Sequence, residues 1–458
     1  MTPRSTPPAP SVAATATAST TAPGEALSRR SFLRRALVAG SVAAVGVPTF
    51  IPARALGRDG FVSPSERITL GGIGIGSRGR HVLECMIAEK DVQFVATCDV
   101  QRTRREAIKA MADKKYGNQD CLLYSDMFEL LARPDIDAVL ITTGDHWHAL
   151  GSILAAKAGK DVYSEKPCGL TMGQCQALDD TIRRYGRVFQ AGTQRRSVPN
   201  FQFAIHLAQS GKLGRLHTMH ASCYQPRLNF DWLPAEPEPP KTECDWDRWL
   251  GPSPWRPYNK TYVNGGWRGH YDFDSGASLL DWAAHTVDLC QMANQADDAG
   301  PIEFEPLPDR IEARYANGVR LIMDFLPTPF GKREPQYRTS TGTCPVRFIG
   351  DEGWIETGDT GQIITHPESL KSGMKQFARM AGTDASTHTR NFLDAVKSRG
   401  LTHCNSKVMR HSHLASHAAA IAWMLGRPLK YDPATESFPG ADDANRMRDR
   451  AMREPWHI

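Results

Sequence analysis

Lys166, Asp281 and His285 are the side chains whose types and spacing best suit proton transfer. The last two are four residues apart in a helical pattern over residues 279–293, so they share one face of the predicted helix. Near neutral pH an imidazole can remove the proton of a secondary alcohol, an amine can share that proton, and a carboxylate can orient a hydroxyl. Each could also be an ordinary polar surface residue, so the surrounding elements must decide whether the three meet.

A glycine-rich segment lies between the first predicted strand, residues 68–73, and a helical pattern that begins near residue 81. Gly74, Gly76 and Gly79 have the GxGxxG spacing. The first glycine permits a tight turn, the second lets the backbone approach a pyrophosphate, and the third lets helix and strand pack closely. The N-terminus of the helix attracts the phosphates. The segment therefore predicts a dinucleotide site, to which Ser77 and Arg78 also contribute.

Asp99 follows the second predicted strand, residues 92–98, and bears on the choice of cofactor. A carboxylate at this position hydrogen-bonds the adenosine ribose hydroxyls and repels a 2′-phosphate, which favours NAD over NADP. Arg102, Arg104 and Arg105 leave NADP open, because a guanidinium group could bind that phosphate. A second interpretation makes Asp99 a helix N-cap or a turn residue.

Strand and helix patterns alternate through residues 66–188, which predicts an α/β fold with a doubly wound parallel sheet of the Rossmann type. Ligands of such sheets bind at the carboxyl ends of the strands. Thr143, Asp145 and His148 follow the strand predicted at residues 138–142, while Glu165 and Lys166 follow the strand predicted at residues 161–164. We therefore expect these five residues in the cofactor site.

Three motifs, in order along the chain, resemble those of the Gfo/Idh/MocA oxidoreductases. The sequence EKP at residues 165–167 is similar to the family's EKP motif, and Asp281 with His285 matches its D-x-x-x-H. Residues 142–149 resemble its strand-end segment, with Gly144 where a proline is usual. The resemblance covers roughly residues 66–432 and implies an NAD enzyme. It also implies that Lys166 lies beside the nicotinamide and the reacting hydroxyl, approached from the second domain by Asp281 and His285.

Residues 189–432 predict a second, α+β domain with an open, largely antiparallel sheet. Residues 192–196 resemble the family's crossing segment beside the nicotinamide, which implies that Gln194 contacts the cofactor. Strand patterns occupy residues 216–224, 311–315, 319–325, 346–349 and 354–357, and hairpin turn residues join the later pairs. Helices at residues 390–398 and 409–425 are expected to pack back on the body, and residues 433–458 form a C-terminal tail.

Residues 225–278 form a long irregular insertion rich in Pro, Trp, Tyr and Arg. Long structured loops near a site are often functional, but we assign most of these aromatic side chains to packing within the insertion. His270, His411, His413 and His417 lack the spacing with carboxylates of a metal site, so we expect no catalytic metal. The ten cysteines include no CxxC pair, and we expect them to be free core thiols.

Residues 1–55 predict a disordered leader that carries an export signal. The segment SRRSFLR at residues 28–34 resembles the twin-arginine motif. The weakly apolar residues 36–51 follow, and Ala53 with Ala55 offers an A-x-A cleavage site. A basic amphipathic arm is the alternative. Twin-arginine machinery exports folded proteins, so the signal predicts a periplasmic or otherwise exported protein that leaves the cytoplasm with its cofactor bound.

Six arginines and one glutamate of this leader account for the whole net charge of +5. The remaining chain holds 49 basic and 49 acidic residues, so it lacks the basic excess that nucleic-acid binding requires. We expect instead a small carbohydrate or cyclitol substrate as the partner, and a homo-oligomeric assembly.

These features predict an NAD-dependent oxidoreductase that acts on a secondary hydroxyl of a sugar, cyclitol or glycoside. An exported enzyme has no ready pool of free NAD, so we expect NAD to stay bound and to be recycled. One version oxidises one sugar and then reduces another. A second resembles the NAD-dependent alpha-N-acetylgalactosaminidases, in which oxidation, elimination, hydration and re-reduction sum to hydrolysis. A nucleotide-loaded binding protein without turnover is less favoured, because Lys166 and His285 are both present.

Overall fold

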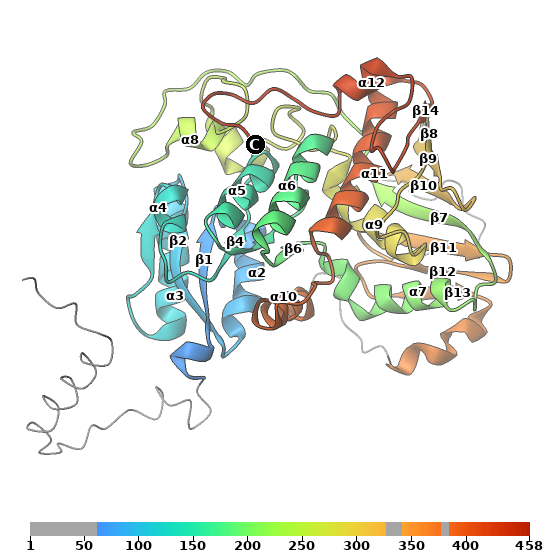
Figure 1. The fold of residues 1–458 in the computed structure, drawn as a ribbon, viewed down its shortest axis with the longest axis horizontal. Coiled ribbons are helices and arrows are strands. Elements are labelled where there is room, and N and C mark those ends of the chain that lie inside the picture. Colours follow the sequence, from blue (N-terminus) through green and yellow to red (C-terminus); the bar gives the residue numbers. More distant parts are fainter. Residues whose placement is uncertain (1–61, 327–340, 377–383) are drawn as a thin grey trace, which may run out of the picture.

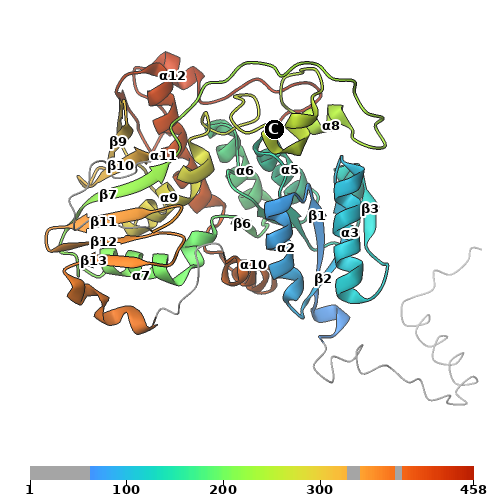
Figure 2. The ribbon, with the colours of Figure 1, turned by 180° about the vertical axis from the view of Figure 1, so that it is seen from behind.

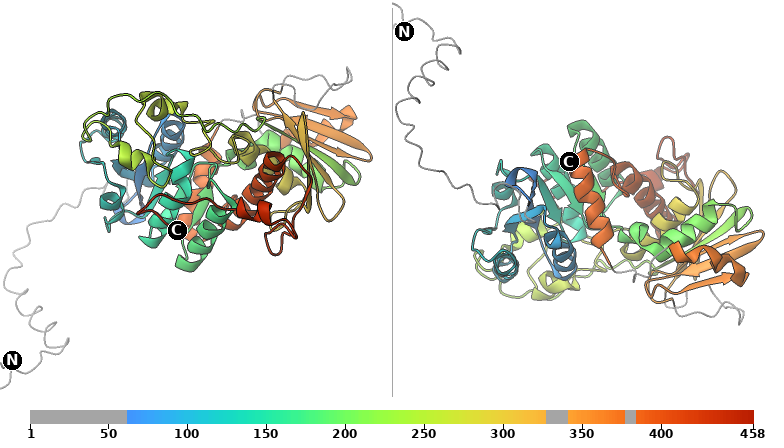
Figure 3. Two further views of the ribbon diagram at one scale, coloured as in Figure 1. Left: turned by 90° about the horizontal axis from the view of Figure 1, so that it is seen from above. Right: turned by 90° about the horizontal axis from the view of Figure 1, so that it is seen from below.

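The computed structural model describes residues 62–326, 341–376 and 384–458 (Figure 1). The leader predicted at residues 1–55, with its export signal, lies outside these ranges. Two sheet-based domains lie side by side along the long axis of the molecule (Figures 1 and 3). Within the described ranges, no helix is both long and apolar enough to cross a lipid bilayer.

The sheet of the first domain has six parallel strands in the order β3-β2-β1-β4-β5-β6, which confirms the predicted doubly wound sheet. The strands are β1 (Ile68–Ile73), β2 (Val92–Cys98), β3 (Leu122–Tyr124), β4 (Ala138–Ile141), β5 (Asp161–Ser164) and β6 (Phe189–Ala191). The central strands β4 and β5 are buried at every residue, as expected when helices cover both faces of a parallel sheet. The edge strand β3 has no counterpart in the sequence prediction, because three residues are too few to show a period.

Five helices connect these strands: α2 (Ser77–Ala88), α3 (Arg102–Tyr116), α4 (Met127–Leu131), α5 (Asp145–Lys157) and α6 (Met172–Tyr185). Helix α2 begins at Ser77, within the glycine-rich segment, earlier than its apolar pattern indicated. Helix α5 likewise begins at Asp145, directly after β4. Both helices thus start at the carboxyl edge of the sheet, where their first N–H groups can bind an anion.

The sheet of the second domain has eight strands in the order β13-β12-β11-β7-β10-β9-β8-β14. The strands are β7 (Leu216–Cys223), β8 (Glu303–Leu307), β9 (Arg310–Arg314), β10 (Arg320–Phe325), β11 (Val346–Gly350), β12 (Gly353–Thr357), β13 (Ile363–His366) and β14 (Leu429–Lys430). Of the neighbouring pairs with a described register, β10 and β7 are parallel and the others antiparallel, which confirms the predicted, largely antiparallel sheet. The predicted hairpin between β9 and β10 turns at Gly318, whose φ of 85° suits glycine.

Helices α7 (Pro199–Gln209), α9 (Leu280–Ala293) and α11 (Ser406–Leu425) pack on this sheet and share its hydrophobic core. Helix α10 (Ser386–Ser398) packs instead on α2 of the first domain (Figures 1 and 2). Its Phe392 and Leu393 belong to the core that contains Ile68 and Leu83. The chain therefore returns to the first domain before α11 and β14 complete the second, and this fixes the two domains against each other.

Two irregular segments cross above the carboxyl edge of the first sheet (Figures 1 and 3). One is the insertion, residues 225–278, which contains the short helix α8 (Trp246–Leu250). Trp246, Tyr262 and Phe273 form its own small core, as predicted for most of its aromatic residues. The other is the C-terminal tail, which leaves α12 (Asp442–Arg446) and ends above α5. Both segments bring residues from far along the chain to the mouth of the Rossmann sheet.

Candidate active site

The glycine-rich segment forms a close-fitting loop between β1 and α2. Gly74 has a φ of 67°, and a Cβ there would lie 2.3 Å from Cγ2 of Thr143. A Cβ on Gly79 would lie 2.1 Å from Oγ1 of Thr142, so only glycine lets α2 pack this closely beside β4. Gly76 is the N-cap residue of α2, which leaves the first N–H groups of the helix available to phosphate oxygens. The loop therefore fits the pyrophosphate of a dinucleotide.

A cavity of about 520 Å³ runs along the carboxyl edge of the first sheet. Most of the predicted site residues line it: Gly74, Gly76, Ser77, Arg78, Gly79, Asp99, Thr143, Asp145, His148, Glu165, Lys166 and Asp281. Gln194 and His285 do not line it. Residues that sequence reasoning did not assign to the site complete the wall, among them Ser125, Phe128, Arg248, Trp249, Val263, Arg268 and Trp456.

Asp99 lies where an acid should meet the adenosine ribose. It is buried, and burial raises the pKa of its carboxyl to about 6. The backbone N–H of Gln101 donates to Oδ1 at 2.8 Å. Of the three nearby arginines, Arg104 lines the cavity, whereas Arg102 pairs with Glu243 and the guanidinium of Arg105 donates to backbone carbonyls. A 2′-phosphate would therefore meet Asp99 and at most one arginine of this group.

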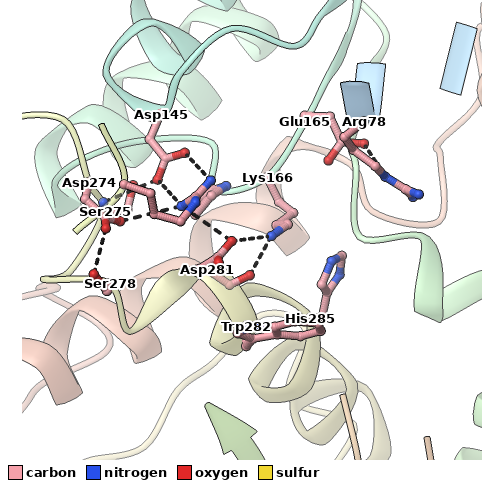
Figure 4. Close-up of polar contacts among 12 residues, drawn as sticks. Arg78, Asp145, Glu165, Lys166, Asp274, Ser275, Ser278, Asp281, Trp282 and His285 are labelled. Atoms are coloured by element: carbon pink, nitrogen blue, oxygen red, sulfur yellow. Dashed lines mark hydrogen bonds and ion pairs between the residues drawn. The ribbon is translucent and has the colours of Figure 1, made fainter. Parts of the chain in front are cut away.

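Lys166 and Asp281 meet across the two domains, as predicted (Figure 4). Nζ of Lys166 lies 2.9 Å from Oδ1 of Asp281 and 2.5 Å from its backbone oxygen. Burial alone would raise the pKa of Asp281, but Lys166 and Arg268 together hold it below its usual value. The amine is therefore held at the end of β5, within the cavity that also contains the glycine loop.

Arg268, from the insertion, joins three carboxylates in this corner of the cavity. Its guanidinium lies 3.4 Å from Asp145, 3.6 Å from Asp274 and 3.4 Å from Asp281. Burial raises the pKa of Asp145, and it raises that of Asp274 to about 6. The guanidinium also stacks on Trp267, 4.4 Å from the ring centre. Neither Arg268 nor Asp274 belongs to a periodic pattern, so the sequence carried no signal for them beyond the insertion itself.

Glu165, which lines the cavity, forms a buried pair with Gln194, which does not. Nε2 of Gln194 donates to Oε1 of Glu165 at 2.6 Å, and Arg78 lies 3.8 Å from the same oxygen. A Cβ on Gly192 would lie 2.8 Å from the Glu165 carboxylate, so this approach requires glycine. Gln194 thus orients Glu165 and does not itself face the cavity, which differs from the role that the resemblance implied.

His148 connects the two strand-end segments that carry the site. Its Nδ1 lies 2.7 Å from the carbonyl oxygen of Pro167, and its Nε2 lies 3.1 Å from that of Thr143. Burial lowers the pKa of the imidazole to about 4, so the ring is neutral at pH 7. A neutral ring has one N–H, so it donates to only one of these two carbonyl oxygens at a time. The buried ring lies between the loops after β4 and β5 and so positions the segment that carries Lys166.

His285 rises from α9 on the same side as Asp281 (Figure 4), but its surroundings differ from those expected of a general base. NH1 of Arg195 lies 2.8 Å from Nε2 and donates to it, and Arg195 in turn pairs with Asp359. Burial, followed by the charge of Arg195, lowers the pKa of the imidazole well below its usual value. Nδ1 is buried without a hydrogen-bond partner in the described ranges. In this arrangement Nε2 has no lone pair free for a substrate proton.

Among the described residues, no group of three or more His, Cys, Asp or Glu side chains is arranged to hold a metal ion. The ten cysteines are free. Nine are buried, and burial raises the pKa of Cys244 to about 11 and that of Cys121 to about 12. Reactive thiolates are therefore not favoured at these positions.

Comparison with known proteins supports both domains. The family model described as oxidoreductase family, NAD-binding Rossmann fold, matches residues 68–193. Its companion, the C-terminal alpha/beta domain of the same oxidoreductase family, matches residues 227–325 and 350–458. An inositol 2-dehydrogenase from Pseudomonas fluorescens is 30% identical over 187 residues, 40% of this chain and 54% of that protein. A glycosyl hydrolase family 109 protein from Solibacter usitatus is 29% identical over 188 residues, 38% of this chain and 41% of that protein.

The chain thus spans about half the length of these relatives. Among solved structures, the WlbA dehydrogenase from Bordetella pertussis, in complex with NADH and UDP-GlcNAcA, has a TM-score of 0.59 at 15% identity. The alignment covers 80% of this chain and 98% of that one, which shows a shared fold. The first domain is an NAD-binding Rossmann domain, and the family models together cover most of the chain. The chain belongs to the Gfo/Idh/MocA family of oxidoreductases.

Proposed function

We propose that the protein uses tightly bound NAD to oxidise a secondary hydroxyl of a sugar, cyclitol or glycoside. The observation that carries the proposal is the pair of Lys166 and Asp281 in the same cavity as the glycine loop. A primary amine beside a dinucleotide site can exchange a proton with a hydroxyl while the hydroxyl carbon is oxidised. Bound NAD supplies the hydride acceptor.

Lys166 is the proposed proton acceptor for the substrate hydroxyl. Its amine takes the proton when it is neutral, and Asp281, 2.9 Å away, then stabilises the ammonium. Arg268 holds the other side of the Asp281 carboxylate, 3.4 Å from the same oxygen. The amine is thus kept in one position, which lowers the cost of reaching the reacting geometry.

His285 remains a candidate for a second proton position. It can accept a proton only after Arg195 releases Nε2, since the guanidinium donates to that nitrogen in the present arrangement. Lys166 therefore acts first in the proposed sequence. This order differs from the expectation that the imidazole removes the hydroxyl proton.

A net hydrolysis is the second candidate. The similarity to a glycosyl hydrolase family 109 protein favours it, although that match spans 38% of this chain. In such a reaction a sugar hydroxyl is oxidised to a ketone, the glycosidic bond is cleaved by elimination, water adds to the resulting alkene, and the ketone is reduced again. The electrons return to the same molecule, so only water is consumed.

One experiment separates the two candidates. Protein purified without added nucleotide is mixed with a panel of sugars, cyclitols and glycosides, and bound-nicotinamide absorbance and product masses are followed together. A lasting absorbance change with loss of two hydrogens from the substrate indicates oxidation. A cleaved glycoside with gain of water and no lasting absorbance change indicates hydrolysis. Protein that binds no sugar-like compound and never reduces NAD would contradict both.

Export by the twin-arginine pathway is part of the proposal, because the leader motif and a retained cofactor fit together. Replacing both arginines at positions 29 and 30 with lysine should keep the protein in the cytoplasm. Cell fractionation of the parent and the variant measures this. A variant that still reaches the periplasm in parent amounts would contradict the assignment of the leader.

A further inference from the structure

The insertion is hydrogen-bonded to the segment that directly follows Asp99. The backbone N–H of Arg102 donates to the carbonyl of Glu243 at 2.9 Å, and that of Asp245 donates to the carbonyl of Val100 at 3.2 Å. Further on, the carbonyl of Val263 accepts bonds from Gln101 at 3.0 Å and from Arg104 at 2.7 Å. The insertion therefore forms a roof over the ribose-binding edge of the cavity.

The C-terminal tail adds Trp456 to this roof. The indole stacks on Phe128, with ring centres 6.2 Å apart and planes within 6°, and meets Trp147 edge-on at 4.9 Å. Phe128 and Trp147 lie in the first turns of α4 and α5 and also line the cavity. Trp456 thus fills the space between the N-termini of α4 and α5 at the carboxyl edge of the sheet.

The end of the cavity that Trp456 covers is the adenosine end. Asp99 and Ser125 follow β2 and β3, the two strands farthest from Lys166 on that side of the sheet. In a Rossmann domain the acid after the second strand binds the adenosine ribose. The nicotinamide end lies toward Lys166 and Asp281. We therefore assign the side of the cavity where Trp456 meets Phe128 to the adenosine, and the side that holds Lys166 and Asp281 to the nicotinamide.

The tail is anchored on both sides of this opening. Arg453 donates from Nε to the carbonyl of Gly251 at 3.0 Å and from NH1 to Asp247 at 2.6 Å, and its backbone N–H donates to Pro252. Nearer α12, Oγ1 of Thr171 donates to Asp449 at 3.1 Å. The tail is thus bound to the insertion and to the first domain, and both attachments must open for it to lift.

One polar atom of this contact has no partner. Nε1 of Trp456 is buried and has no hydrogen-bond partner in the described ranges. A buried N–H without an acceptor is unfavourable, so a shift of the indole that lets a bound molecule supply an acceptor would stabilise the closed tail. A ring nitrogen or hydroxyl of adenosine is an acceptor of the right kind.

We propose that the C-terminal tail retains NAD, with Trp456 covering the adenosine and Arg453 fastening the tail to the insertion. The proposal rests on the proposed function, in which NAD stays bound between turnovers. It explains why NAD would leave slowly: the dinucleotide can exit only when the tail lifts from Phe128 and Trp147. The tail does not reach Lys166 and takes no part in proton transfer.

The test measures exchange of bound NAD. The parent, Trp456→Ala and Arg453→Ala are loaded with NAD, freed of excess nucleotide and mixed with isotopically labelled NAD, and the bound fraction is followed by mass spectrometry. Loss of one partly buried aromatic anchor should speed release about tenfold or more. His457→Ala is the matched control, because His457 is exposed on the same tail and does not line the cavity. It should exchange at the parent rate.

Circular dichroism and saturable NAD binding establish that each variant is folded. Should Trp456→Ala fail to fold, Arg453→Ala carries the test, because it loosens the tail and leaves the indole intact. If both folded variants exchange NAD at the same rate as the parent, the proposed role of the tail is wrong, although the parent can still retain NAD by other contacts. A parent that holds no NAD would instead contradict retention in the proposed function. In that case both substitutions should still raise the Kd for added NAD above the parent value, and equal Kd values in the parent and both variants would overturn the role of the tail.

Discussion

Replacing Lys166 with alanine should separate catalysis from stability. In the intact pair, Nζ lies 2.9 Å from Oδ1 of Asp281, and the two side chains are 15% and 17% exposed. When the Lys166 amine is protonated, the two charges at this distance attract by roughly 6 kcal/mol at an effective dielectric constant of about 20. Desolvation of the partly buried charges offsets most of that attraction, so the net contribution to folding is far smaller.

Arg268 decides how much stability is lost. Its guanidinium lies 3.4 Å from the same carboxylate oxygen, so Asp281 keeps one cation when Lys166 is removed. We therefore expect a loss of about 1 kcal/mol in the free energy of unfolding. Turnover should fall by about 10²- to 10⁴-fold, which corresponds to roughly 3–5 kcal/mol of transition-state stabilisation. The catalytic loss should thus be several times larger than the loss in stability.

The assay follows reduction of bound nicotinamide in a single turnover, with thermal unfolding measured on the same samples. His285→Ala is the comparison, because Arg195 already occupies its Nε2 and the expected loss of turnover is smaller than for Lys166→Ala. In the double variant, a loss smaller than the product of the single losses indicates that both residues handle one proton. A folded, NAD-loaded Lys166→Ala variant that keeps more than about a tenth of the parent turnover would refute the proposed role.

Three other predictions concern the cofactor site and its acid stability. Asp99→Ser should reduce the preference for NAD over NADP by ~1.5–3 kcal/mol, which is the value of a charge-assisted hydrogen bond. Binding titrations with both nucleotides measure this preference, and a parent protein that prefers NADP would contradict the interpretation of Asp99. Gly79→Ala should destabilise the protein by about 1–3 kcal/mol and weaken NAD binding, because its Cβ would lie 2.1 Å from Oγ1 of Thr142. Gly151→Ala, whose Cβ would lie 3.7 Å from its nearest neighbour, should be neutral or stabilising in the same melts. Burial lowers the pKa of His148 to about 4, so the folded state favours the neutral ring. This preference contributes roughly 3 kcal/mol to the free energy of unfolding above pH 6.5, and the contribution is lost as the pH falls toward 4. His148→Gln should flatten that part of the stability profile, and an unchanged slope in denaturant titrations would count against the buried neutral imidazole.

Local spacing determined much of the cofactor site in advance. A GxGxxG between a strand and a helix is typical of the dinucleotide-binding turn, and side chains after neighbouring parallel strands meet at one edge. The sequence therefore predicted the glycine loop, Asp99 and Lys166 at a common cavity, and the structure brings them there. Asp281 also lines the cavity, whereas His285, one turn further along the same face of α9, does not, so sharing a helix face was not sufficient to place both residues there.

Tertiary packing alone decided what surrounds those residues. Arg195 and His285 are 90 positions apart, and no period links them, yet their contact removes the free lone pair on which the expected role of the imidazole depended. Arg268 and Trp456 come from an irregular insertion and a tail, whose path is set by contacts with distant elements rather than by local propensity. Periodic patterns report which face of an element a side chain occupies. Only the folded chain determines which distant side chain it meets, because that depends on how whole elements pack.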